Sequence, residues 1–101
     1  MPFAILIVLI VSAFVAPAVD AAESDRGDRN RIRAMVVAEA RDMRLAVSLA
    51  LAVAQAESDF DPLTESHKGA RGVMQIMPAT AMGEYGIPPD MLWNPRVNIR
   101  L

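Results

Sequence analysis

Two polar side chains in this sequence lie where apolar residues lead up to them or surround them. Glu57 follows residues 45–56, which are nearly all Ala, Leu and Val, and Gln75 is a lone amide within Val73–Met77. A carboxyl group beside apolar surface is favoured in its neutral form, which can donate a proton. Glu57 thus places a carboxyl group at the end of an apolar helix, although a Glu in that position, taken alone, is more often a solvated surface residue than a catalyst. Gln75, taken alone, is interpreted as a core amide.

Other polar residues offer less chemistry. Asp59 and Asp61 follow Glu57 closely and resemble a second catalytic carboxylate, but we expect them to fill loop and cap positions. His67 is the only histidine, and no cluster with metal-ligand spacing surrounds it. The chain has no cysteine, which excludes disulfides and a thiol nucleophile. We expect no metal and no cofactor.

Helices are the elements predicted to position these groups. Apolar residues at three- and four-residue spacings predict an amphipathic helix over about 29–43. The apolar run 45–56 predicts a second helix that is buried on most sides, ending at Glu57. No Gly or Pro separates the two, so one long helix is possible; we favour two helices with a tight turn near 44–47.

The second half of the chain reads as a loop followed by two short helices. Residues 63–72 contain the loop formers Ser, Thr and Gly. A helix is expected over Ala79–Tyr85, closed by Gly86 in a left-handed conformation, and another after the Asn94 cap. The predicted fold class is all-α.

The first residues form a strongly apolar leader. We expect a signal peptide over 1–22, cleaved near Ala21 or Ala22, and a polar linker over 23–30. The alternative is that the leader stays uncleaved as an anchor. We expect the chain to contact the membrane only through this leader. The chain would then be exported. The formal net charge of -2 gives little support for nucleic-acid binding.

Three segments carry a family resemblance. Residues 49–62 (LALAVAQAESDFDP) and 69–81 (GARGVMQIMPATA) resemble two motifs of the soluble lytic transglycosylase family, in the lysozyme-like superfamily. Residues 92–99 (LWNPRVNI) are similar to a third stretch, in which the family commonly has Phe and Asp at the second and third positions. The resemblance covers about 32–101, and its agreement in order and spacing makes it specific.

The resemblance implies a lysozyme-like helical domain over 31–101 that cleaves peptidoglycan, in the periplasm or cell envelope of a bacterium. Glu57 matches the family's catalytic acid, which protonates the oxygen of the β-1,4 bond between N-acetylmuramic acid and N-acetylglucosamine. The same residue then removes the proton from the muramic 6-hydroxyl, which attacks its own anomeric carbon and leaves a 1,6-anhydro end. Ser66, Gln75 and Met77 fall where the family contacts substrate; from the residues alone they read equally as a loop cap, a core amide and a packing residue.

One departure from the family pattern keeps alternatives open. The family's later motif, an Ala-Tyr-Asn-Ala-Gly-type stretch whose Tyr lies over the catalytic Glu, has no counterpart here, so we expect a domain that is incomplete at its C-terminus. A non-catalytic peptidoglycan-binding or envelope-assembly module, or an inactive truncated fragment, would also fit. The expected partners are peptidoglycan glycan strands, with envelope or secretion-system proteins as further possibilities.

Overall fold

The computed structural model describes residues 2–101, with side chains from Asp20 onward. In chain order the elements are α1 (Pro2–Asp42), α2 (Val47–Ser58), α3 (Pro78–Tyr85), the 3-10 helix η1 (Pro89–Trp93) and α4 (Pro95–Arg100). Beside these helices, the described residues contain only two isolated β-bridges. The predicted all-α class is therefore confirmed.

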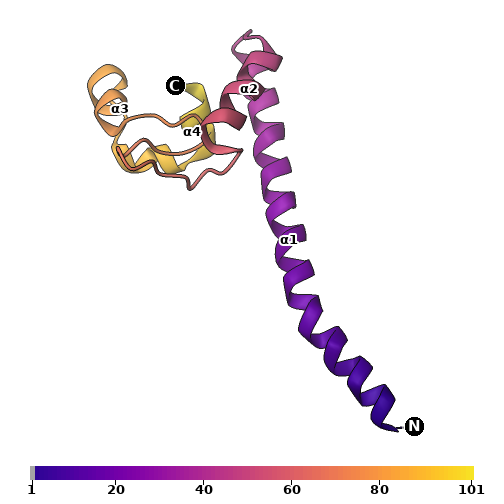
Figure 1. The fold of residues 1–101 in the computed structure, drawn as a ribbon. Helices are drawn as coiled ribbons and strands as arrows, with labels where there is room; N and C mark the ends of the chain where they lie inside the picture. The colour runs from indigo at the N-terminus through magenta and orange to yellow at the C-terminus, as the bar shows by residue number, and fades with distance from the viewer. Residues whose placement is uncertain (1) are drawn as a thin grey trace.

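Helix α1 is the long element, and it extends away from the other helices, which gather around its C-terminal end (Figure 1). Ile32, Val36 and Ala40 lie four residues apart and are almost completely buried, because this face of α1 packs against the rest of the chain. The expected amphipathic helix is present and ends at Asp42, close to the predicted 43.

The segment 23–30 has a regular conformation, and its predicted role as a polar linker stays a prediction. It is helical and continuous with the rest of α1, and all its side chains are exposed. Gly27 is the only helix breaker in the segment and costs about 1 kcal/mol, which a helix continuing on both sides tolerates. Ion pairs one turn apart, such as Arg29 with Asp25 at 3.3 Å, support the helical conformation.

The side chains of residues 1–19, which carry most of the predicted signal peptide, lie outside the described part. Cleavage near Ala21 or Ala22 stays a prediction. Within the described part of the chain, none of the helices combines the length and the apolar character needed to cross a membrane.

The predicted break between the first two helices is confirmed. Residues 43–46 form a tight turn in which Arg44 has a φ of 57° and the Leu45 amide donates to the Ala40 carbonyl at 2.8 Å. Ser48 lies inside α2 rather than capping it, since the residue at the cap position is Ala46.

Helix α2 is much more exposed than its composition predicted. We expected burial on most sides, but only Ala54 and Ser58 are buried. Leu45, Leu49 and Val53 are 56%, 65% and 40% exposed. The reason is that α2 packs with one face against α1 and the following loop, while no described element covers the opposite face.

Helix α4 closes the other side of the core. Ile99 packs with Ile32, Val36 and Val73. Both predicted signals in the second half are also present: Gly86 ends α3 at a φ of 66°, and the Asn94 side chain accepts hydrogen bonds from the first turn of α4.

A buried carboxylate fastens α4 to α1. Glu39 is 7% exposed, and its two oxygens lie 3.2 Å from Arg96 Nε and 2.8 Å from Arg100 Nη1. A buried carboxylate needs such partners to offset its lost hydration. The pairs therefore fix the rotation of α4, and with it the direction of the side chain between the two arginines, Asn98.

Candidate functional site

Glu57 lies in the last turn of α2, and its side chain is exposed. It continues the four-residue spacing of Leu45, Leu49 and Val53, so it lies on the same open face of the helix. Val53, one turn earlier, is the nearest apolar neighbour along that face. The enclosing apolar surface expected around Glu57 is therefore not formed, because α2 is uncovered on this side.

Ser58, the next residue, projects about 100° farther round the helix and is buried. Its hydroxyl donates to the Val73 carbonyl at 2.7 Å and also lies 3.2 Å from the Ala54 carbonyl oxygen. The first of these hydrogen bonds spans 15 residues and joins the end of α2 to the segment that carries Gln75. Glu57 is thus positioned by its neighbour, a role that the sequence did not reveal.

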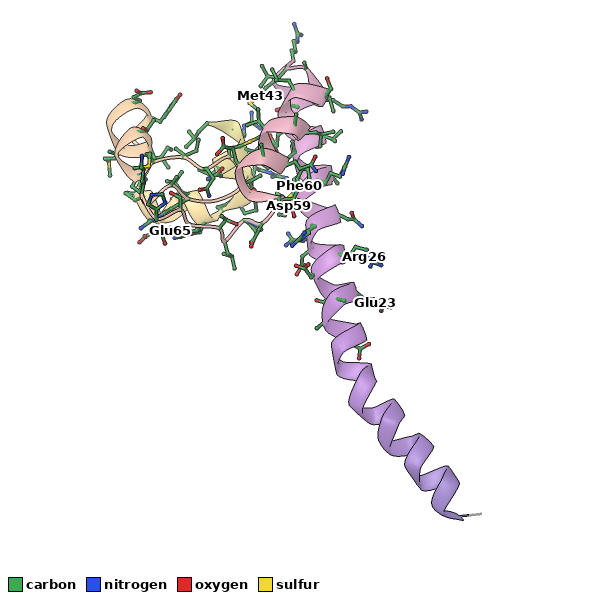
Figure 2. The ribbon with its side chains drawn as sticks, viewed as in Figure 1. Glu23, Arg26, Met43, Asp59, Phe60 and Glu65 are labelled. Carbon is green, nitrogen blue, oxygen red and sulfur yellow. The ribbon has the colours of Figure 1, made fainter. Side chains whose placement is uncertain are left out.

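The two acidic residues after Ser58 have structural roles, as expected. Asp59 is the left-handed C-cap of α2, at a φ of 50°, and its side chain pairs with Arg29 at 2.6 Å. Asp61 Oδ1 accepts a hydrogen bond from the Leu63 amide at 2.9 Å. Figure 2 shows Asp59 and Phe60 where α2 meets α1, and Glu65 farther along the same loop.

Ser66 lies in that loop and is partly buried. Its hydroxyl oxygen accepts a hydrogen bond from the Ala70 amide at 3.0 Å, and its own amide donates to the Ala70 carbonyl at 2.9 Å. The side chain therefore closes the 66–70 turn, which is the loop-cap role. Its O–H group is still able to donate a hydrogen bond outward.

Gln75 occupies a left-handed backbone conformation, with a φ of 54°. Its side-chain Nε2 donates to the carbonyls of Thr64 at 2.9 Å and Gly72 at 3.0 Å. Both amide hydrogens therefore hold the loop together. The side-chain oxygen Oε1 is the group that can still accept a hydrogen bond from a ligand.

Arg71 fastens the same turn to η1. Its Nη1 donates to the Pro89 carbonyl at 3.2 Å, and its guanidinium lies 5.1 Å from the centre of the Trp93 ring. Arg71 also forms isolated bridges with Glu65 and Ile76 through its backbone. Its buried Nε has no hydrogen-bond partner within the described residues.

The four predicted site residues are linked through their segments rather than by direct side-chain contacts. Gln75 joins the loop that bears Ser66 through Thr64, and Ser58 joins both to the helix that bears Glu57. Met77 directly precedes α3 and is 40% exposed, which leaves its side chain available to a ligand. The predicted roles in substrate binding stay predictions.

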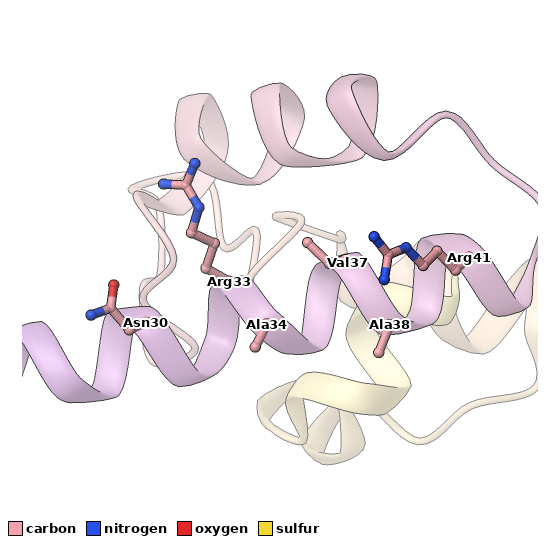
Figure 3. A pocket seen from close by; sticks show the side chains of 6 residues that line it. All are labelled: Asn30, Arg33, Ala34, Val37, Ala38 and Arg41. Carbon is pink, nitrogen blue, oxygen red and sulfur yellow. The ribbon is translucent and has the colours of Figure 1, made fainter.

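One cavity of the described part lies away from these residues. It has a volume of about 580 Å³ and runs along the outer face of α1, where Ala34, Val37 and Ala38 lie between Arg33 and Arg41 (Figure 3). It contains none of the predicted site residues and is formed by one helix, so we do not assign it to the site. Within the described residues, no group of three His, Cys, Asp or Glu side chains could hold a metal ion.

A second groove, of about 350 Å³, adjoins the site. It is lined by apolar residues of α2, of the Gln75 turn and of α4 and the residue after it: Leu45, Ala46, Leu49, Ala50, Val53, Met74, Ile76, Ile99 and Leu101. The open face of α2 forms one wall, and the residues on either side of Gln75 contribute to the other. Sequence reasoning missed this groove, although the four-residue spacing that ends at Glu57 could have indicated it.

Comparison with known proteins gives the family. The model of the transglycosylase SLT domain matches residues 34–101. The soluble lytic murein transglycosylase of Escherichia coli (strain K12) is 41% identical over 61 residues, 54% of this chain and 10% of that protein. The protein of the same description from Salmonella typhimurium (strain LT2) is 38% identical over 68 residues, 60% of this chain and 10% of that protein.

The chain therefore spans about one tenth of the length of the curated relatives it matches. No solved structure matches it. The family match covers most of the chain, including both motifs and the whole of α2, α3, η1 and α4. This chain belongs to the transglycosylase SLT domain family.

Proposed function

We propose that this chain acts on peptidoglycan as a lytic transglycosylase, with Glu57 as its single general acid and base. The observation that carries the proposal is the position of Glu57: it ends the exposed face of α2, and Ser58 ties it to the turn of Gln75. The family match includes both segments.

The proposed reaction uses one carboxyl group twice. As the acid, Glu57 gives its proton to the glycosidic oxygen while the bond from that oxygen to the anomeric carbon of N-acetylmuramic acid breaks. The 6-hydroxyl of the same sugar then forms a bond to that carbon, and the Glu57 carboxylate accepts the hydroxyl proton. Glu57 ends the cycle protonated, and the products are a free N-acetylglucosamine end and a 1,6-anhydro end.

The geometry fits a single-carboxylate reaction better than one with two carboxylates. Asp59 is paired with Arg29, and Asp61 accepts from the loop backbone, so both nearby acids already have structural partners. A hydrolase would need a second carboxylate to activate water or to attack the sugar. In the proposed reaction the substrate supplies the nucleophile.

The remaining contacts would orient the sugar chain. We propose that Ser66 donates through its O–H, that Gln75 accepts through Oε1, and that Met77 offers apolar surface to a sugar ring. Hydroxyl and acetamido groups of peptidoglycan sugars can accept from the first and donate to the second. The groove beside α2 is lined by the open face of that helix, which also bears Glu57, and by the residues on either side of Gln75.

The test is digestion of isolated peptidoglycan by the full chain, followed by mass spectrometry of the released fragments. Glu57→Gln keeps the shape of the side chain but removes the acid, and it should abolish release. Glu84→Gln removes another exposed carboxylate, on α3, and should leave release unchanged. Equal release by the parent chain and Glu57→Gln would refute the assignment.

A second candidate is a peptidoglycan-binding module without turnover. The exposure of Glu57 favours it, because a catalytic acid gains its neutral form from burial and this side chain is open. This candidate predicts that the chain sediments with insoluble peptidoglycan and that Glu57→Gln sediments equally, with no fragments released by either. Failure of the parent chain to sediment would exclude it.

A further inference from the structure

We propose that Asn98 is a positioning residue that sets the Gln75 turn for substrate. The inference rests on the proposed function, in which Gln75 contacts the sugar chain. Asn98 lies in α4, 23 positions beyond Gln75 in the sequence, and its side chain is fully buried. A fully buried amide is costly unless all its hydrogen-bonding groups are paired.

Asn98 meets that requirement through three hydrogen bonds to two segments, the Gln75 turn and η1. Its Oδ1 accepts from the Met74 amide at 2.7 Å, and its Nδ2 donates to the Arg71 carbonyl at 2.8 Å and to the Leu92 carbonyl at 3.1 Å. The first two bonds hold residues on both sides of Gly72. The third ties the same amide to η1. The side chain thus adds to the backbone hydrogen bonds between Arg71 and Ile76 and gives the Met74 amide its acceptor.

Gly72 shows how closely the amide is fitted. A Cβ at this position would lie 2.4 Å from Asn98 Nδ2 and 2.7 Å from the Leu92 carbonyl oxygen, and the backbone φ is 79°. The turn therefore needs glycine for two independent reasons, its left-handed conformation and the approach of Asn98.

The effect on Gln75 follows from its backbone. A left-handed conformation is unfavourable for glutamine and persists only when neighbouring contacts enforce it. The Asn98 side chain accepts a hydrogen bond from the amide of Met74, the residue before Gln75. The side-chain amide of Gln75 in turn donates to the carbonyls of Thr64 and Gly72. Because these two hydrogen bonds fix Nε2, they also fix the orientation of Oε1 in the same planar amide. The site then selects hydrogen-bond donors of the substrate, such as an acetamido N–H or a hydroxyl.

The mutational test compares two asparagines of the same helix. Asn98→Asp keeps the acceptor for Met74 but loses the donors to Arg71 and Leu92, whereas Asn94→Ala removes only the exposed cap of α4. Binding of the full chain to insoluble peptidoglycan is measured by sedimentation at a temperature where circular dichroism shows each variant folded. We expect Asn98→Asp to weaken binding about tenfold, as loss of one or two hydrogen bonds allows, and Asn94→Ala to bind as the parent does.

A second measurement needs no mutation and no substrate. In the parent chain, the Met74 amide and the Asn98 side-chain amide hydrogens should exchange with solvent far more slowly than the exposed Asn94 amide hydrogens, as read by nuclear magnetic resonance. This measurement tests the inference even if the Asn98→Asp variant does not fold. Exchange of the Asn98 hydrogens as fast as those of Asn94 would overturn the inference.

The outcomes separate the two proposals. A parent chain that does not bind peptidoglycan contradicts the proposed function, while slow exchange at Asn98 would still support its hold on the turn. A folded Asn98→Asp variant that binds as tightly as the parent overturns the positioning role and leaves the proposed function intact.

Discussion

The Gln75 turn and the open face of α2 lie next to each other and are built in opposite ways. The turn, residues 71–76, is irregular, yet side chains from α2 and α4 hydrogen-bond to its backbone, and the Gln75 side chain donates to the carbonyl of Thr64 in the preceding loop. The open face of α2 is regular and apolar, yet Leu49 and Val53 on it are 65% and 40% exposed, and Leu45 in the turn just before it is 56% exposed. Hydrogen bonds within the chain fix the first region, while the second has no described partner.

This contrast shows where the chain can tolerate change. A substitution in the turn removes a contact that nothing else replaces, so stability should respond strongly. A substitution on the open face removes little packing, so stability should respond weakly, whereas binding can still change. Glu57 and Gln75 lie on the two sides of this boundary.

The largest effect is expected from Gly72→Ala. The added methyl group would overlap Asn98 and the Leu92 carbonyl, and alanine is strained at a φ of 79°. We expect a loss of about 3 kcal/mol in the free energy of unfolding, measured by urea denaturation. Gly69→Ala is the control for the backbone alone, since its φ is 93° but a methyl group there meets open space. Equal losses in both variants would show that the Asn98 contact adds nothing.

The second largest loss of stability is expected from Ser58→Ala. It leaves the Val73 carbonyl buried without its donor at 2.7 Å, at a cost of about 2 kcal/mol. Ser48→Ala, on the exposed side of the same helix, should change the free energy of unfolding by less than about 0.5 kcal/mol. The same denaturation experiment checks both, and a Ser58→Ala effect as small as that of Ser48→Ala would mean that α2 and the turn are not coupled.

Part of the fold and of the candidate site could be predicted from the sequence. The apolar period predicted the C-terminal part of α1, and residue types predicted the Gly86 stop and the Asn94 cap, because each of these rests on a local pattern. The break at 43–46 was favoured over one long helix, although no Gly or Pro marks it. The helical state of 23–30 and the open face of α2 were not predicted, since composition does not say which surface a neighbouring element covers. The roles of Ser58 and Asn98 depend on bonds across 15 and 24 residues, which no local pattern contains.

A smaller effect is expected at Gln75 itself. Glycine relieves the left-handed backbone at a φ of 54°, so Gln75→Gly should be more stable than Gln75→Ala by about 1 kcal/mol in the free energy of unfolding. Both variants lose the hydrogen bonds to Thr64 and Gly72, so their difference isolates the backbone. Both should also lose binding to peptidoglycan in sedimentation. Alanine matching or exceeding glycine would contradict a strained turn.

The smallest effect should come from the open face. Leu49→Ala removes a side chain that is 65% exposed, and the free energy of unfolding should change by about 0.5 kcal/mol or less. Leu92→Ala is the matched change at a fully buried leucine and should cost about 3 kcal/mol. Thermal denaturation of the pair checks the comparison; a Leu49→Ala loss as large as that of Leu92→Ala would show that this face is covered in solution.

The most direct test of the account is digestion of peptidoglycan in water enriched with heavy oxygen. Because the substrate's own hydroxyl is the proposed nucleophile, the parent chain should release 1,6-anhydro fragments that carry no heavy oxygen, and Glu57→Gln should release none. Labelled reducing ends would show that water attacks the sugar, and release that is unchanged in Glu57→Gln would show that another group is the acid. Either result would contradict the assignment of Glu57 as the single acid and base.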